Sequence, residues 1–208
     1  MTKLDESTII KIFQKEFGNK KFVSEDVETF NLGKIKIIAK TDTLVESTDI
    51  PKKMGLEDAA RKSIVACVSD FASKGIRPEF GIISVNLPKN ISRSKITSIA
   101  KGFKKAATEY GITILGGDTN AGKEIVFNVS IFRNSEKIVT RKDSKIGDII
   151  FVTGPFGYTA AGLSILLHKK KAKREFCKVI TVCTIMDDNL EELLDVVRLC
   201  KELGAERV

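Results

Sequence analysis

The sequence is short of several residue types, and each shortage excludes a class of function. It contains no Trp, two Tyr and one His among 208 residues. Without interleaved aromatic side chains the chain offers no stacking platform for nucleic acid. The only histidine, His168, lies in a lysine-rich segment, which argues against Ser–His–Asp or Cys–His catalysis. No apolar run reaches the roughly 20 residues that span a bilayer, so neither nucleic acid nor a membrane is an expected partner.

Cysteine is also scarce, and its spacing is uninformative for metal binding. None of the four cysteines belongs to a Cys-x-x-Cys pair, and Cys67 falls within a helical pattern. Free, mostly buried thiols are the simplest interpretation. Residues 1–11 are charged and lack the apolar stretch of a signal peptide, which predicts a cytoplasmic location.

Positive charge is in excess, with 35 Lys and Arg against 27 Asp and Glu. The basic residues are scattered apart from the run at 169–174, which we interpret as a solvated helix end. Such an excess helps to gather anionic, phosphorylated substrates. With 42% hydrophobic residues, the chain can bury the core of one domain or of one and a half.

The apolar pattern predicts strands that alternate with helices. Strands are expected at 34–40, 80–87, 112–115, 125–133, 148–153 and 179–185, and helices at 6–17, 56–74, 92–110, 159–171 and 189–203. The helices at 56–74 and 92–110 are long and amphipathic. The fold class is therefore α+β: a mixed sheet with two long helices packed on one face, followed by a partial second α/β unit.

Four short acidic clusters are the most informative feature of the chain. They lie at 24–26, 41–43, 68–70 and 115–119, and each places a carboxylate at the end of an apolar segment. Magnesium prefers oxygen ligands and usually takes one or two carboxylates together with substrate phosphates. The clusters therefore indicate nucleotide-phosphate chemistry.

Two of these clusters have a structural alternative. Asp70 follows small residues on its helix, so its carboxylate is expected to be half-buried and must be paired or bind a metal. Its partner would otherwise be Arg77 or Arg61. Gly117 and Asp118 could bring backbone N–H groups and a metal ligand to a phosphate, or they could form an ordinary glycine turn. No GxxxxGK[ST] loop is present.

Taken in order, the clusters and their flanking residues resemble the thiamine-monophosphate kinase family, within the aminoimidazole-ribonucleotide-synthetase-like ATP-binding superfamily. Residues 41–51 resemble the family's TDxLVE loop, and 59–62 with 68–78 its NxSDLAAxGxxP helix. Residues 115–119 resemble the GGDT loop, and 140–163 the segment R…GD…VTG…AAGL. The resemblance covers about residues 5–170.

The resemblance implies transfer of the γ-phosphoryl group of ATP to thiamine monophosphate, with Mg²⁺ as cofactor. Its pattern assigns Mg²⁺ to Asp26, Thr41, Asp42, Asp70 and Asp118, ATP to Gly117, Asp118 and Arg141, and the substrate loop to Asp49. It also implies a homodimer whose N-terminal sheets join. We expect an ATP- and Mg²⁺-binding and dimerisation domain at 1–140 and an incomplete C-terminal domain at 141–208.

The sequence departs from the family pattern in places. Asp49 stands where bacterial members usually carry His, and Glu25 replaces an Asp beside Asp26. The family's later DxSDGL segment, which carries further metal-binding aspartates, has no full match. Residues 186–190 are either a shortened relic of it or part of an unrelated strand–helix unit. Two other functions therefore stay open: an ATP-binding or dimerisation module without catalysis, and a sister synthetase of the superfamily.

Overall fold

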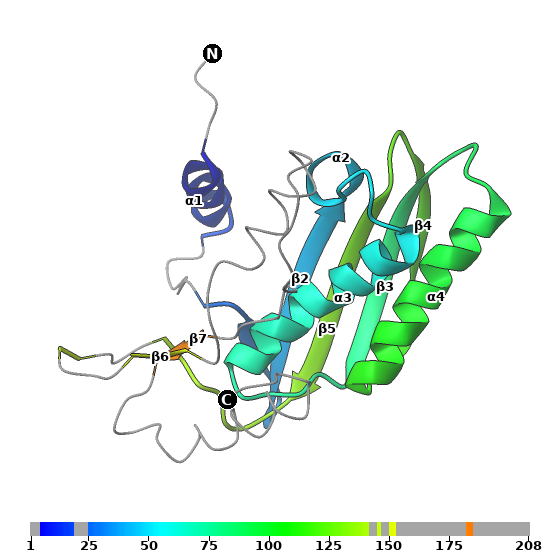
Figure 1. Ribbon diagram of the computed structural model, residues 1–208. Coiled ribbons are helices and arrows are strands. Elements are labelled where there is room, and N and C mark those ends of the chain that lie inside the picture. The colour runs from blue at the N-terminus through cyan, green and yellow to red at the C-terminus, as the bar shows by residue number, and fades with distance from the viewer. Residues whose placement is uncertain (1–4, 19–24, 142–144, 147–149, 153–181, 185–208) are drawn as a thin grey trace.

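The computed structural model describes residues 5–18, 25–141, 145–146, 150–152 and 182–184 (Figure 1). The elements are α1 (Glu6–Glu16), β1 (Glu28–Leu32), β2 (Ile35–Val45), α2 (Glu46–Asp49), α3 (Leu56–Ser73), β3 (Phe80–Pro88), α4 (Arg93–Tyr110), β4 (Thr113–Gly122), β5 (Val126–Asn134), β6 (Ile150–Val152) and β7 (Val182–Thr184). The helices predicted at 159–171 and 189–203 lie outside the described residues. Among the helices that are described, none combines the length and the apolar character needed to cross a membrane.

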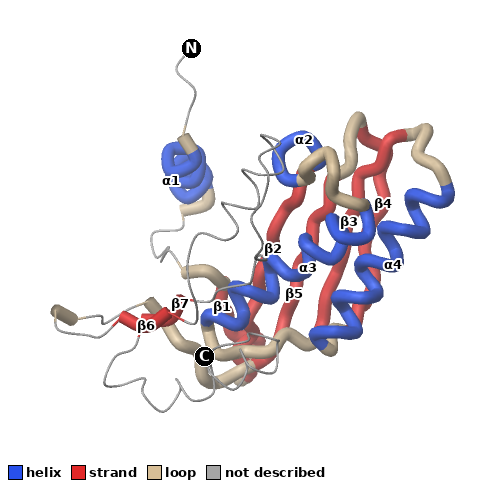
Figure 2. Tube along the Cα trace, viewed as in Figure 1, coloured by secondary structure: helices blue, strands red, loops and turns tan. Residues whose placement is uncertain are grey.

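One mixed sheet organises the described part of the chain. Its strand order is β1-β2-β5-β3-β4, and β3 and β4 are parallel whereas the other neighbours are antiparallel. The two long helices α3 and α4 cover one face of this sheet, as the tube view in Figure 2 shows. Strands β6 and β7 pair separately. The predicted α+β architecture, with two long helices on one face, is confirmed.

The core lies between the sheet and α3. Side chains of β5 alternate between the two faces, as the pleat requires: Phe127, Val129 and Ile131 are fully buried on the helix side. Phe71 of α3 is also fully buried in this core. Phe103 of α4 meets Phe127 edge to face at 5.1 Å between ring centroids. Neither α3 nor α4 covers the opposite face of the sheet.

Local sequence signals set the ends of the long helices where they were predicted. The Ser92 side chain caps α4 by accepting a hydrogen bond from the backbone N–H of Lys95. Gly111 ends the same helix in the left-handed region, at φ 67°. Gly75 follows α3 with φ 68°. The predicted extents at 56–74 and 92–110 are therefore confirmed to within one residue.

Two strands run further than the sequence predicts. Strand β2 continues to Val45, so Thr41 and Asp42 lie inside it and not at its end. Strand β4 continues to Gly122, so Gly117 and Asp118 lie in an edge strand and not in the glycine turn that was one of the two alternatives. Glycine is depleted in strands, but pairing along β3 supplies the backbone hydrogen bonds that hold this segment extended. Strand β1 and helix α2 were not predicted.

The closest approach of α3 and α4 depends on a glycine. A Cβ at Gly102 of α4 would lie 2.0 Å from the carbonyl oxygen of Glu57 and 2.9 Å from the Cβ of Ala60. We expect Gly102→Ala to lower the free energy of unfolding by about 1–3 kcal/mol through overpacking. Helix propensity alone predicts the opposite sign, since Ala is favoured over Gly by about 1 kcal/mol.

Chemical denaturation distinguishes these outcomes. The exposed Ala100 on the same helix provides the control, because Ala100→Gly reports the propensity term without a packing contact. A Gly102→Ala chain that is more stable than wild type would contradict the packing argument.

Candidate functional site

The last turn of α3 presents two charged side chains to other segments of the chain. Asp70 pairs with Lys40 of β2, with 2.5 Å between Nζ and Oδ2, and both side chains are about a quarter exposed. Lys74, one turn later, reaches the acidic residues that precede β1. The C-terminal end of α3, which carries the cluster 68–70, therefore lies beside the cluster 24–26, through Lys74, and beside β2, which carries the cluster 41–43.

The first group contains Asp42, Asp70 and Lys40. Lys40 and Asp42 are two residues apart on β2, so both side chains lie on the helix side of the sheet. Burial alone would lower the pKa of Lys40, but the hydrogen bond to Asp70 and the charge of Asp42 outweigh it, so the pKa is raised. The structure thus brings Asp42 and Asp70 into one neighbourhood around a single ammonium group.

Cys67 lies beneath this group and stays a neutral thiol. Burial, with a smaller contribution from the charge of Asp42, raises the pKa of Cys67 to about 12. Its Sγ lies 3.4 Å from the carbonyl oxygen of Val129, to which the thiol donates. The expectation that Cys67 is free and buried is confirmed, and its role is to pack.

The second group is held by a buried lysine that sequence reasoning missed. The Lys74 side chain is 3% exposed, and its Nζ lies 2.6 Å from Glu25 Oε2 and 3.2 Å from Asp26 Oδ2. The Arg141 guanidinium also pairs with Asp26, and the Arg141 backbone N–H donates to Glu25 at 3.0 Å. The structure therefore brings together Asp26 and Arg141, which the resemblance assigns to Mg²⁺ and to ATP.

The charges of the second group explain the titration of its acids. Burial opposes ionisation of Glu25, but the Lys74 ammonium and the Arg141 backbone N–H outweigh it and lower its pKa. Burial likewise opposes ionisation of Asp26, whose pKa is nonetheless lowered by Lys74, Arg141 and Ser73. Both carboxylates are therefore held in the charged form that a cation site requires.

Thr41 lies on the other face of the sheet from Asp42. Its hydroxyl donates to the carbonyl oxygen of Val129 at 3.3 Å and accepts a hydrogen bond from Ser130 Oγ at 3.0 Å. Two residues further along β2, the Thr43 hydroxyl donates to the Asn128 side chain across the same pair of strands. The open face of the sheet thus carries a row of hydroxyl and amide groups.

Gly117 and Asp118 lie on edge strand β4, separated from β2 by β5 and β3. The Asp118 carboxylate accepts a hydrogen bond from Asn120 Nδ2 at 2.5 Å. A Cβ at Gly117 would lie 1.6 Å from the carbonyl oxygen of Ile83, so only glycine allows β4 to pair here. The structure does not gather Asp118 with Asp42 and Asp70.

Asp49, at the end of α2, holds its own loop. Its carboxylate accepts hydrogen bonds from the Val45 backbone N–H at 2.7 Å and from the Thr48 hydroxyl at 3.0 Å. Its carbonyl oxygen accepts a hydrogen bond from Lys62 Nζ. Any contact of Asp49 with substrate would be made by a side chain already fixed in position.

The donor chemistry fits a hard divalent cation, although the full ligand set is not assembled. In the described ranges, no three Asp, Glu, His or Cys side chains are grouped closely enough to hold a metal. Asp42 and Asp70 are the acids that the structure does bring together, and carboxylate oxygen is the donor that Mg²⁺ takes. Asp26, before β1, and Asp118, on β4, carry the same donor chemistry but lie apart from this pair.

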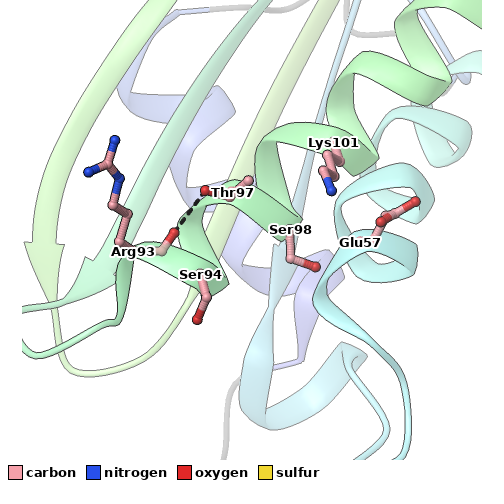
Figure 3. Close-up of a pocket in the computed structure, with 6 residues that line it drawn as sticks. All are labelled: Glu57, Arg93, Ser94, Thr97, Ser98 and Lys101. Carbon is pink, nitrogen blue, oxygen red and sulfur yellow. Dashed lines mark hydrogen bonds between the residues drawn. The ribbon is translucent and has the colours of Figure 1, made fainter.

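A separate hollow of about 490 Å³ lies between the N-terminal ends of α3 and α4 (Figure 3). It is open, and the polar residues Glu57, Arg93, Ser94, Thr97, Ser98 and Lys101 line it. None of the residues predicted for the site lines it. The candidate site is therefore the cluster at the other end of α3.

The comparison with known proteins bears on this cluster. Residues 24–132 match the family described as "AIR synthase related protein, N-terminal domain". The chain is 70% identical over 176 residues to the thiamine-monophosphate kinase of Nitrosopumilus maritimus (strain SCM1), which covers 85% of this chain and 56% of that protein. It is 34% identical over 167 residues to the thiamine-monophosphate kinase of Pyrococcus horikoshii, covering 80% of this chain and 54% of that protein. The chain thus spans just over half the length of these relatives.

A solved structure agrees with the sequence comparison. The structure described as "AaThiL complexed with AMPPCP and TMP" matches with a TM-score of 0.74 at 26% identity, over 84% of this chain and 58% of that one. The matched segment of the family includes both long helices and the acidic residues at the end of α3. The chain therefore belongs to the AIR synthase related family and is similar to the thiamine-monophosphate kinases within it.

Proposed function

We propose that the protein carries out Mg²⁺-dependent transfer of the γ-phosphoryl group of ATP to thiamine monophosphate, giving thiamine diphosphate. The observation that carries the proposal is 70% identity over 176 residues to a thiamine-monophosphate kinase. AaThiL, of similar fold, was solved with AMPPCP, an ATP analogue, and TMP. The cluster of acids at the end of α3 supplies donors suited to the cation in such a reaction.

Phosphoryl transfer depends on positioning and on positive charge, because the protein has little covalent chemistry to perform. We assign Mg²⁺ to Asp42 and Asp70. Asp26, Thr41 and Asp118 do not join this pair, Thr41 because it lies on the opposite face of the sheet and Asp118 because it lies on β4, and we assign them to further Mg²⁺ ions. The bound cation would neutralise charge on the phosphate oxygens during transfer. The chain's own contribution is to fix the carboxylates on β2 and α3, two rigid elements that pack on each other.

Arg141 is the residue best suited to hold a phosphate directly. Its side chain is 58% exposed although the guanidinium pairs with Asp26. A planar guanidinium can donate to a carboxylate on one edge and to a phosphate on another. We assign Gly117 and Asp118 to the nucleotide as well, and Asp49 to the loop that contacts thiamine monophosphate.

Assembly belongs to the same proposal. The sheet face opposite the helices exposes apolar side chains, including Phe30 and Ile35 at 52% and Ile82 at 41%. Exposed apolar groups of this kind mark association surfaces. We propose a homodimer joined through these faces, active in the cytoplasm, with a domain boundary near residue 140. The solution mass tests the dimer.

The assay for the proposed function uses the chain of residues 1–208 with ATP, thiamine monophosphate and Mg²⁺. We expect thiamine diphosphate to form, and we expect a Lys104→Met control, on the exposed side of α4, to form it equally well. If Mg²⁺-dependent ATP binding occurs without product, the protein is an ATP-binding module and the kinase proposal fails. If neither ATP nor Mg²⁺ raises the melting temperature, the ATP site is absent, since a ligand of the native state must stabilise it.

A further inference from the structure

Lys40 is the cation that the structure places between two of the acids assigned to Mg²⁺. Its Nζ lies 2.5 Å from Asp70 Oδ2, and the side chain is 23% exposed. Asp42 lies two residues from Lys40 on the same face of the same strand. The ammonium therefore neutralises both carboxylates from within the protein.

In the described part of the chain, Lys40 is the cation that forms an ion pair with Asp70. Beneath it, Cys67 of α3 is a neutral thiol, and the neighbouring Val129 of β5 is apolar and fully buried. The other lysine near this turn, Lys74, is paired with Glu25 and Asp26. Without Lys40, Asp70 would lose the ion pair that the described part of the chain supplies to it.

A divalent cation and an ammonium group cannot both take the same carboxylate oxygen at contact distance. Mg²⁺ requires oxygen ligands at about 2.0–2.1 Å and repels a nearby positive charge. Mg²⁺ bound at Oδ2 of Asp70 would therefore displace the Lys40 ammonium, and Mg²⁺ bound at Oδ1 would still be repelled by it. The lysine stem is flexible, and its partial exposure gives the ammonium room to move.

We propose that Lys40 is a positioning residue that holds Asp42 and Asp70 in the metal-free protein and is displaced when the cation binds. The inference rests on the proposed function, since it takes these two acids as cation ligands. It assigns to Lys40 two measurable effects: the lysine supports the fold without metal, and it weakens metal binding by competition. A lysine with a purely structural role would have the first effect alone.

Direct binding of Mn²⁺, a spectroscopic substitute for Mg²⁺, tests the competition. Titration of the 208-residue chain without nucleotide, followed by the electron paramagnetic resonance signal of free Mn²⁺, gives the affinity. We expect Lys40→Met to bind Mn²⁺ about fivefold more tightly than wild type, the factor corresponding to loss of one partly exposed ion pair. Lys40→Arg keeps the charge and should bind no more tightly than wild type.

Thermal unfolding provides the second readout. Without metal, the melting temperature of Lys40→Met should be lower than that of wild type. Saturating Mg²⁺ should raise the melting temperature of Lys40→Met by more degrees than it raises the melting temperature of wild type. Lys104→Met controls for the change in net charge and should match wild type in both measurements. If Lys40→Met does not fold, Lys40→Gln replaces it in the same titration.

The outcomes separate this inference from the proposed function. Unchanged or weaker Mn²⁺ binding in Lys40→Met overturns the inference, as does the absence of Mn²⁺ binding in all variants. Tighter binding in Lys40→Met by a chain that makes no thiamine diphosphate would leave the inference standing and overturn the kinase proposal.

Discussion

Asp70→Asn is expected to remove Mg²⁺-dependent ATP binding and, with it, formation of thiamine diphosphate. Asn keeps the shape of the side chain but loses the negative charge and one acceptor oxygen, both of which a hard cation requires. Changes in the residues that merely support metal ligands already cost about 10–100-fold, so loss of an assigned ligand should cost at least about a hundredfold in metal affinity. Isothermal titration with Mg²⁺ and ATP measures it.

A second aspartate on the same helix provides a matched control. Asp58 is exposed in the first turn of α3, far along the helix from Asp70, so Asp58→Asn makes the same chemical change away from the site. We expect that variant to bind Mg²⁺ and ATP as wild type does. Normal Mg²⁺-dependent binding by Asp70→Asn would show that the cluster at the end of α3 is not the metal site.

The long helices could be predicted because their signals are local. The apolar period of 56–74 and 92–110, the cap at Ser92 and the stop at Gly111 depend on residues within a few positions of one another. The strand ends could not be predicted in this way. Gly117 looks like a turn residue in the sequence, and it becomes part of β4 only because Ile83 of β3 pairs with it.

The residues of the candidate site likewise fall into those that local sequence predicts and those that it does not. The acids were found because they recur in a specific order with recognisable neighbours. Their partners were missed because each comes from a distant segment: Lys74 lies 49 positions from Glu25, and Asp70 pairs with Lys40 of β2. An alternation rule could have placed Lys40 on the face of Asp42. No local pattern indicates that Lys74 turns inward, since lysine is almost never fully buried without a partner.

Lys74→Met should be the most destabilising charge substitution in the described part of the chain. Met fills a similar volume but leaves Glu25, 13% exposed, and Asp26, 23% exposed, without the Lys74 ammonium. Removing one partner of a buried ion pair costs about 3–5 kcal/mol, and the partial exposure of Asp26 places our expectation near the lower value, about 3 kcal/mol. Urea denaturation at pH 7 measures the loss, with Lys104→Met as the exposed control.

The pH dependence of the stability lost in Lys74→Met shows whether the ion pairs of Lys74 cause the loss. The pKa values of Glu25 and Asp26 are held below their ordinary values of 4.5 and 3.8, so their stabilisation is present above those values. It is lost as pH falls through the lowered values, because the native state must then take up protons. The gap in unfolding free energy between wild type and Lys74→Met should therefore narrow below about pH 4.

A double-mutant cycle with Glu25→Gln completes the argument. If the pair supplies the stability, the double variant Glu25→Gln with Lys74→Met should be less destabilised than the sum of the two single variants, because no charge is left without its partner. Additive losses would instead mean that Lys74 acts through the packing of its stem. In that case Asp26 and Arg141 would be held together by their own ion pair, and Lys74→Met would leave the affinity for ATP unchanged.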